Sequence, residues 1–444
     1  MDAREVALLA LSDSARRDGG WSDGALKKRL GEARLDRRDA ALATHLCYGV
    51  VQNRMLLDYY LSRFSNTPLK RMEIKVVILL RLGLFQMLFL TRVPHSAAVS
   101  SAVELTHKYC KNARAAGLVN GILRAVERKL DDLPALPAED RAEYLSVRYS
   151  HPLWLVKRLG ALLDDDSLVA LLEANNAVAP LAVQVNTLRV ERGALVDRLV
   201  REGVEALPHP WLDNCLILNG TGNLEELESY RNGLLFVQDP AARLAVLAAG
   251  AKPEMRVLDC CAAPGGKSFA LCLDMADRGE VLSCDLHPHK KALLLAGRDR
   301  LGFQSMTPMT ADASRFRPEW EGAFDLVLAD VPCSGLGVIR KKPDVRYKDP
   351  VELAQLPTIQ LGILNNVARY VKAGGTLVYS TCTILPEENE QVVDRFVSDH
   401  DDFVSVPFSL PAPAADAPEG RITLWPQKHG TDGFFIAKLA RRQV

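Results

Sequence analysis

The fold is decided by residues 256–268, Arg-Val-Leu-Asp-Cys-Cys-Ala-Ala-Pro-Gly-Gly-Lys-Ser. The apolar run Arg256–Cys260 predicts a buried strand, the Pro-Gly-Gly turn ends it, and a helical pattern begins at Ser268. Three more apolar runs, each followed by a helical stretch, repeat this arrangement at Glu280–Asp285, Phe324–Asp330 and Gly375–Ser380. Alternating strands and helices predict an α/β fold, a doubly wound Rossmann-like sheet over residues 236–444.

The loop after the first strand has the composition of a cofactor site. It reads Cys261-Ala262-Ala263-Pro264-Gly265-Gly266-Lys267, where nucleotide-like cofactors meet such a sheet. The glycines allow close backbone approach, and the following helix offers free N–H groups. A phosphate loop is the alternative, since Gly266-Lys267-Ser268 ends like G-x-x-x-x-G-K-S, but its first glycine would fall at Cys261. No G-x-G-x-x-G dinucleotide fingerprint occurs.

Two aspartates follow the next two strands. Asp285 comes about 20 residues after the glycine loop, where an acid can accept both ribose hydroxyls of an adenosine cofactor. Asp312 would follow a further strand, the third of five, and could accept from the adenine amino group. Each also has a purely structural interpretation, since an exposed Asp is common in loops and Asp often caps a helix.

Two cysteines follow the fourth and fifth strands. Asp330-Val331-Pro332-Cys333-Ser334-Gly335 and Ser380-Thr381-Cys382-Thr383 end neighbouring strands, so we expect both thiols to face one crevice beside the cofactor. Other cysteines are expected to be small buried hydrophobes, namely Cys47, Cys110, Cys215, Cys272 and Cys284. No C-x-x-C pair occurs, so we expect no metal.

Basic residues suggest a polyanionic partner. Arg340-Lys341-Lys342 follows the Cys333 motif and could hold an RNA backbone at the rim of the site, although it could equally be a solvated loop. Residues 1–150 hold 24 Lys+Arg against 17 Asp+Glu, a net +7, and the remainder of this neutral chain is −7. The excess favours RNA as partner, with solvated helix faces as the alternative. Helical clusters that could add affinity are Lys70-Arg71, Lys108, Lys111, Arg114, Arg124, Arg128 and Lys129.

The length of 444 residues predicts more than one domain, since single cores stop growing at about 250–300 residues. A helical periodicity, broken at Asp18-Gly19-Gly20, Asn66-Thr67-Pro68 and Val93-Pro94, predicts an all-helical domain over residues 1–130. A linker is expected over 131–145 and a small α+β module over 146–235. We further expect a cytoplasmic monomer that does not enter membranes, because no secretory signal is visible, the most apolar window (Ile74–Leu90) carries charges, and the cysteine number is odd.

Together these motifs resemble the RNA 5-methylcytosine methyltransferase family (RsmB/Sun/Fmu), which carries paired cysteines in Pro-Cys and Thr-Cys motifs. The matching segments, in family order, are Cys261–Lys267, Asp285, Asp312, Asp330–Gly335, Tyr379–Thr383 and Asp432-Gly433-Phe434-Phe435. Residues 1–130 resemble the NusB-like RNA-binding domain, a pairing typical of the ribosomal RNA branch. Val331 replaces the usual alanine and Cys260 a usual aliphatic residue, which leaves the chemistry intact.

The resemblance implies S-adenosylmethionine as cofactor and carbon 5 of a cytosine in RNA as target. The likeness to the ribosomal RNA branch further implies that this base is cytosine-967 of 16S ribosomal RNA. Carbon 5 is a poor nucleophile until a thiolate adds to carbon 6. By resemblance Cys382 is that nucleophile and Cys333 the base in the later elimination. Asp330 could accept from the cytosine amino group or hold a protonated N3, and it also lies against the cofactor.

Three alternatives remain open at this stage. The first is another methyltransferase class, acting on DNA or on exocyclic amines. Amine methyltransferases typically place Asp/Asn-Pro-Pro-aromatic after the fourth strand, where this chain has Asp330-Val331-Pro332-Cys333. A non-catalytic RNA-binding or assembly factor with a vestigial fold is disfavoured by the intact cysteines and glycine loop. The same chemistry on tRNA is not distinguished by the residues.

Overall fold

The computed structural model describes residues 1–15, 23–414 and 416–443, so the expected break at Asp18-Gly19-Gly20 lies outside the described residues. The chain forms two compact units. The helical unit comprises Met1–Ala177 together with Ile339–Asp349, and the sheet unit comprises Val178–Val338 together with Pro350–Val444. Among the described residues, no helix is both long and apolar enough to cross a membrane.

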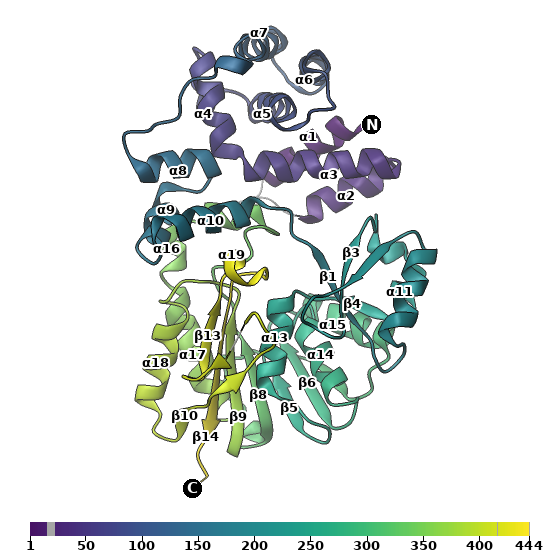
Figure 1. The fold of residues 1–444 in the computed structure, drawn as a ribbon, viewed down its shortest axis with the longest axis vertical. Helices are drawn as coiled ribbons and strands as arrows, with labels where there is room; N and C mark the ends of the chain where they lie inside the picture. Colours follow the sequence, from purple (N-terminus) through teal and green to yellow (C-terminus); the bar gives the residue numbers. More distant parts are fainter. Residues whose placement is uncertain (16–22, 415, 444) are drawn as a thin grey trace. The chain divides into compact units, whose positions relative to one another are not determined.

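The helical unit is organised around a helix that is apolar on nearly every side. α5 (Ile74–Phe89) is buried along most of its length, which is typical of a central helix. Around it the side chains of α1, α3 and α7 close one continuous core. The helices of this unit, drawn in purple to blue in Figure 1, are α1 (Ala3–Ala15), α2 (Asp23–Ala33), α3 (Arg37–Gln52), α4 (Arg54–Phe64), α5, α6 (His95–Tyr109), α7 (Ala115–Glu127), α8 (Arg141–Tyr149), α9 (Leu153–Gly160) and α10 (Asp165–Asn176), with short 3₁₀ turns at Leu69–Arg71 and Leu130–Asp132.

The unit also takes in a distant piece of chain, Ile339–Asp349, whose 3₁₀ turn is Pro343–Tyr347. Arg346 of this piece is fully buried, and burial lowers its pKa to about 10. The Tyr347 hydroxyl donates to the Val51 carbonyl at 3.0 Å, and the Arg54 guanidinium lies 3.5 Å from the Tyr347 ring centre. The Arg346 guanidinium donates to oxygens of Asn176, Ser150, Tyr149, Gln52 and Asn175 at 2.8–3.4 Å.

Replacing Arg346 with alanine should therefore destabilise the protein by about 3 kcal/mol or more, because several buried carbonyl groups lose their donor and a cavity is left. Urea unfolding measures this cost. Lys342→Ala, an exposed position of the same segment, is the matched control and should change stability by no more than about 0.5 kcal/mol. Equal stabilities of the two variants would contradict the anchoring role of Arg346.

The sheet unit begins with a small antiparallel sheet in the order β2-β3-β1-β4. Its elements are β1 (Leu181–Val185), α11 (Arg192–Arg201), β2 (Glu205–Pro208), β3 (Cys215–Asn219), a 3₁₀ turn at Leu224–Glu226, α12 (Glu228–Arg231) and β4 (Leu235–Val237). The buried Asn186 amide donates to the carbonyls of Gly233 and Leu301, so this sheet is tied to the end of α15 (Pro288–Leu301).

The larger sheet has the order β10-β14-β9-β8-β5-β6-β7, with β13 paired to β14. Strands β5 to β9 are parallel and the C-terminal strands are antiparallel. Because β5 leads outward through β6 and β7 while β8 and β9 lie on its other side, the order reverses between β5 and β8. Ligands of doubly wound sheets bind at such a point. The strands are β5 (Arg256–Asp259), β6 (Glu280–Asp285), β7 (Met306–Thr310), β8 (Phe324–Asp330), β9 (Val371–Thr381), β10 (Phe403–Ser405), β13 (Arg421–Leu424) and β14 (Phe434–Arg441), with a separate pair β11 (Phe408–Ser409) and β12 (Asp416–Ala417).

Helices cover both faces of this sheet (Figure 1). Neighbouring strand residues alternate between the two cores: Val257 packs with α13 (Pro240–Ala249), α14 (Gly266–Asp274) and α15, whereas Leu258 packs with α17 (Leu356–Ala368) and α18 (Glu390–Asp399). Two short helices, α16 (Pro350–Leu353) and α19 (Pro426–His429), and a 3₁₀ turn at Pro318–Trp320 complete the unit.

The predicted fold class is confirmed, and β6 and β8 have the expected bounds. The expected domain boundaries stay predictions, and the compact units divide the chain at other positions. Residues 146–177 form helices that pack in the helical unit rather than in the α+β module, and the β1–β4 sheet shares a compact unit with the larger sheet. The reason for the second difference is shared core packing: Phe236 of β4 contacts Phe269 of α14 at 5.6 Å between ring centres.

Candidate active site

The glycine loop turns sharply into α14. Gly265 has φ +116°, and a Cβ there would lie 2.4 Å from the Phe269 ring, so only glycine fits. The Ala262 amide donates to the Cys284 carbonyl at 2.7 Å, which fixes the loop to β6. The N-cap residue of α14 is Gly265, and no side-chain cap hydrogen bond is made there among the described residues. The loop therefore leaves a helix N-terminus available at the edge of the sheet.

A buried chain of polar groups lies under this loop. Asp259, at the end of β5, is fully buried and accepts from the Ser268 hydroxyl at 2.7 Å, and Ser283 donates to Ser268 at 2.8 Å. Burial is the main reason why the pKa of Asp259 is raised to about 7. The sequence reading did not single out Asp259. Its position at the end of the first strand was the signal that could have identified it.

The two predicted cofactor aspartates lie at the ends of β6 and β7. Asp285 is buried, accepts from the His287 amide at 3.2 Å and has the Lys290 ammonium 3.4 Å away. Asp312 accepts from the amide and hydroxyl of Ser314 at 2.9 and 2.6 Å, and these bonds hold its pKa below the usual range. A cavity of about 350 Å³ opens here, lined by Leu286, Thr310, Ala311, Asp312, Arg315 and Arg317.

Lys267 and Asp330 form an ion pair beside the two cysteines. The Lys267 Nζ lies 2.7 Å from Asp330 Oδ2, and the Ser380 hydroxyl donates to Asp330 Oδ1 at 2.8 Å. Burial of the ammonium lowers the pKa of Lys267, but the Asp330 charge outweighs this effect, so the pKa is raised. A negative charge on Cys382 also raises it, so Lys267 is close enough to favour a Cys382 thiolate.

The structure brings the two predicted thiols together. β8 and β9 pair in parallel with Asp330 opposite Ser380, and each strand is followed by its cysteine within three residues. The sulfur atoms of Cys333 and Cys382 lie 3.1 Å apart, and the Cys382 amide donates to the Cys333 sulfur at 3.3 Å. The pKa of Cys333 lies well above its ordinary value because of its hydrogen bond to Cys382, its burial and nearby negative charges. The two thiols are close enough to share a hydrogen bond, and the raised pKa of Cys333 favours its protonated form.

Polar residues behind the cysteines support both turns. The buried Glu388 carboxylate accepts from the Ser334 amide at 2.9 Å, and Gln360 donates to Glu388 at 2.9 Å. The Ser334 hydroxyl donates to Thr383 at 2.8 Å. The sequence reading missed Glu388 and Gln360, because Gln360 lies on α17 and no local pattern links it to either cysteine motif.

The basic residues expected to contact RNA have different surroundings. Arg340 is only 9% exposed and, like Lys341 and Lys342, belongs to the helical unit. Burial leaves Arg340 little surface for phosphate, whereas Lys342 is exposed. Lys108, Arg124 and Lys129 form ion pairs with acidic residues, while Lys70, Arg71, Lys111, Arg114 and Arg128 are exposed.

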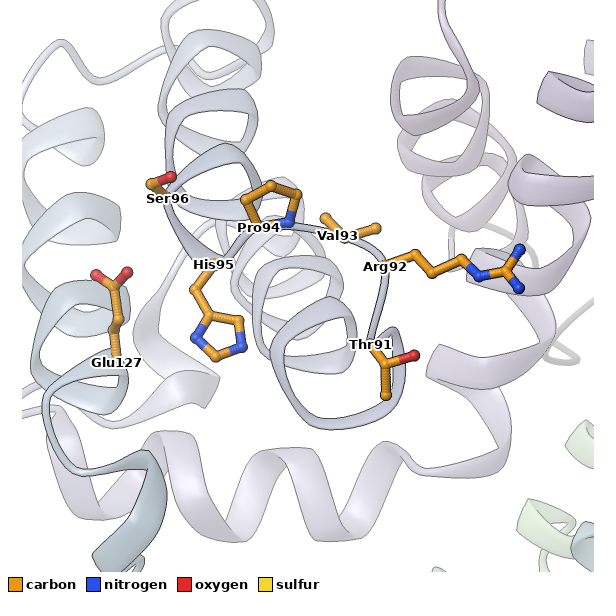
Figure 2. Close-up of a pocket in the computed structure, with 7 residues that line it drawn as sticks. All are labelled: Thr91, Arg92, Val93, Pro94, His95, Ser96 and Glu127. Carbon is orange, nitrogen blue, oxygen red and sulfur yellow. The ribbon is translucent and has the colours of Figure 1, made fainter.

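The helical unit has a cavity of its own, of about 470 Å³, at the connection between α5 and α6. Figure 2 shows its lining: Thr91, Arg92, Val93 and Pro94 from the connection, His95 and Ser96 from the start of α6, and Glu127 from the end of α7. None of the predicted site residues lines it. We therefore place the candidate site at the edge of the larger sheet and not here.

Of the other cysteines, Cys47, Cys215, Cys272 and Cys284 are buried as expected, and Cys110 is half-buried. All nine cysteines are free. Burial raises the pKa of Cys110 to about 11 and of Cys272 to about 12, so neither is a reactive thiol.

Comparison with known proteins gives matches along the whole chain. Residues 246–440 match the 16S rRNA methyltransferase RsmB/F family, residues 1–128 the NusB family, and residues 151–225 the ferredoxin-like domain of RsmF/B-like methyltransferases. The chain is 37% identical to the probable ribosomal RNA small subunit methyltransferase B of Bacillus subtilis (strain 168), over 99% of this chain and 98% of that protein. It is 33% identical to the protein of the same name from Synechocystis sp. (strain ATCC 27184 / PCC 6803 / Kazusa), over 99% and 100% of the two chains.

A solved structure shares the fold of the entire chain. The crystal structure of PH0851 superposes with a TM-score of 0.83 at 24% identity, over 98% of each chain. At that identity the likeness bears on the fold alone.

Proposed function

Since this chain belongs to the RsmB/F family of 16S rRNA methyltransferases, we propose that it transfers a methyl group from S-adenosylmethionine to carbon 5 of a cytosine in small-subunit ribosomal RNA, through a covalent bond between Cys382 and the base. One observation carries the proposal: the Cys333 and Cys382 sulfurs lie 3.1 Å apart beside the Lys267–Asp330 ion pair. By its likeness to the family, the target is cytosine-967 of the 16S RNA.

The residues at the edge of the sheet fit the cofactor. Gly265 brings the loop backbone close to a ligand, the N-terminus of α14 carries no side-chain cap, and Asp285 lies at the end of the next strand with its oxygens able to accept from ribose hydroxyls. The cavity of about 350 Å³ beside Asp312 is lined by the apolar Leu286 and Ala311, as an adenine ring requires. When bound, S-adenosylmethionine supplies an electrophilic methyl group.

Asp285→Ala should weaken cofactor binding by about 10- to 100-fold, because a carboxylate that accepts from hydroxyl groups contributes about 1.5–3 kcal/mol. Isothermal titration calorimetry measures the affinity. Asp299→Ala is the control, since Asp299 is an exposed acid of α15 that pairs only with Arg298 among the interactions described. Unchanged affinity in Asp285→Ala would overturn our placement of the ribose.

Cys382 acts as the nucleophile in this proposal. Its thiolate, favoured by the Lys267 ammonium, adds to carbon 6 of the cytosine, and the electron pair of the 5,6 double bond becomes available at carbon 5. Carbon 5 then takes the methyl group. Asp330, already bonded to Lys267 and Ser380, lies at the end of β8 three residues before Cys333 and can accept from the cytosine amino group.

Cys333 acts after the methyl transfer. The carbon 5 proton must leave, and the bond from carbon 6 to sulfur must break so that Cys382 departs as thiolate. Before the attack, Cys382 is the largest cause of the raised pKa of Cys333. Once the Cys382 sulfur is bonded to carbon 6, it can no longer be a thiolate, so this effect disappears. Cys333 can then lose its proton to solvent water, and the resulting thiolate can accept the proton from carbon 5.

Transfer of tritium-labelled methyl groups from S-adenosylmethionine tests the substrate. Protein-free 16S RNA should be labelled, while total tRNA should remain unlabelled under the same conditions. If tRNA were labelled instead, the substrate would be tRNA and not ribosomal RNA. Cofactor binding without label in any RNA would favour a non-catalytic RNA-binding factor.

A further inference from the structure

A buried carboxylate lies directly behind the Cys333 turn. Glu388, on the connection between Cys382 and α18, is 1% exposed. It accepts from the amide of Ser334, the residue after Cys333, at 2.9 Å. It also accepts from Gln360, whose amide nitrogen donates to the carbonyl of Pro332, the residue before Cys333, at 3.0 Å. Glu388 therefore holds both neighbours of the thiol.

The same residue is tied to the strand that carries the other cysteine. The Tyr379 hydroxyl donates to the Glu388 carbonyl at 2.6 Å, and the next residue, Asn389, bonds the Thr381 hydroxyl and the Thr383 carbonyl at 2.6 and 3.1 Å. Thr381 and Thr383 flank Cys382. One short connection thus fixes the neighbours of both thiols at once.

These contacts do not use the whole carboxylate. The Oε1 atom of Glu388 is buried and has no hydrogen-bond partner among the described residues. A buried carboxylate with a free oxygen is costly, and a neutral glutamine could meet the same Ser334 amide with its oxygen. The negative charge is therefore not needed to hold the turn, which points to a role in the chemistry of the adjacent thiol.

We propose that Glu388 is a positioning residue for Cys333: its buried carboxylate fixes the turn that presents the thiol to Cys382 and keeps a negative charge behind that thiol during elimination. The inference rests on the proposed function. It assigns no contact of Glu388 with substrate or cofactor.

The titratable groups that face Cys333 come from several elements. They are Tyr379 of β9, Cys382 directly after that strand, Asp330 from the end of β8 with its partner Lys267 from α14, and Glu388. Apart from the Cys382 hydrogen bond and burial, the pKa of Cys333 is raised by Cys382, Glu388 and Asp330 in that order. In the covalent adduct the contribution of Cys382 is lost. Glu388 is then the largest remaining charge that makes Cys333 a stronger base.

The pH dependence of adduct resolution tests this role. Full-length enzyme, 16S RNA and S-adenosylmethionine are mixed in a single turnover, and the covalent adduct is followed on denaturing gels from pH 6 to 10. Resolution should speed up with pH as Cys333 loses its proton. In Glu388→Gln the rise of the resolution rate with pH should occur about one pH unit lower, because a like charge beside the thiol is gone. If the resolution rate of Glu388→Gln rises at the same pH as that of wild type, the proposed role of the Glu388 charge is wrong.

Two further variants separate charge from anchoring. Gln360→Met removes the amide that donates both to the Pro332 carbonyl and to Glu388, but the carboxylate and its bond to the Ser334 amide remain. Resolution should therefore slow several-fold, with a pH dependence closer to wild type than that of Glu388→Gln and with an unchanged KM for S-adenosylmethionine. Resolution at the wild-type rate would overturn the positioning role, and this holds even if Glu388→Gln does not fold. Glu390→Gln is the matched control, since Glu390 bonds Thr423 instead of the cysteine turn, and it should behave as wild type.

Failure of the inference is distinguishable from failure of the proposed function. If wild type makes 5-methylcytosine and the two variants resolve the adduct normally, only the role of Glu388 is wrong. If wild type makes no 5-methylcytosine and Cys333→Ala forms no adduct, the proposed function itself is wrong.

Discussion

Replacing Cys382 with alanine should abolish methylation, lowering the rate by roughly 10⁴-fold or more, as expected when a covalent nucleophile is removed. Without the thiolate, carbon 5 stays a poor nucleophile and no bond to carbon 6 forms. The ion pair of Lys267 with Asp330 and the glycine loop remain, so cofactor affinity should stay within about twofold of wild type. Labelled methyl transfer to 16S RNA measures the rate, and calorimetry the affinity.

Cys110→Ala is the matched control for this variant, since Cys110 is a half-buried thiol of the helical unit and none of the site motifs includes it. It should keep the wild-type rate. Substantial methylation by Cys382→Ala would mean that another group attacks carbon 6, or that no covalent step occurs.

Replacing Cys333 with alanine should have a different effect: the enzyme should stop as a covalent RNA adduct. Cys382 still adds to carbon 6, and the methyl group is still transferred, but the thiol 3.1 Å away that accepts the carbon 5 proton is missing. Most of the enzyme should therefore run as a slow, nuclease-sensitive band on a denaturing gel when S-adenosylmethionine and RNA are present. Wild type should show little of this band, because its adduct resolves quickly.

The double variant Cys333→Ala/Cys382→Ala provides the control, because it should form no band. If the single Cys382 variant gave the band and the Cys333 variant did not, the two roles would be exchanged. If neither variant gave it, covalent catalysis would be contradicted.

The sheet and its cysteine pair could be predicted because they depend on short-range patterns. Apolar runs that end at Cys260, Asp285 and Asp330 predict strands, and parallel strands bring their carboxyl ends to one edge. Asp330 and Ser380 are paired in the sheet as this argument requires, so Cys333 and Cys382 had to meet. The glycine loop could be interpreted for a similar reason, since only glycine fits the φ of Gly265.

The groups behind the site could not be predicted, because they depend on contacts between distant segments. Gln360 reaches Glu388 and Pro332 from a separate helix, and nothing in the spacing of these residues indicates it. Likewise, the basic run at Arg340 suggests an exposed RNA contact. Only the structure shows that the following Arg346 is enclosed by carbonyl groups of the helical unit. A charged side chain in a loop is normally solvated, and its burial depends on partners supplied elsewhere in the chain.

We propose that this chain methylates carbon 5 of one cytosine in small-subunit RNA. Bisulfite sequencing tests it most directly, because 5-methylcytosine resists the deamination that converts cytosine. Unmodified 16S RNA should be incubated with the protein and S-adenosylmethionine, with the Cys382→Ala variant as the control reaction. We expect a single protected cytosine that is absent from the control. Methyl transfer to the RNA that leaves every cytosine convertible, or equal protection with Cys382→Ala, would contradict it.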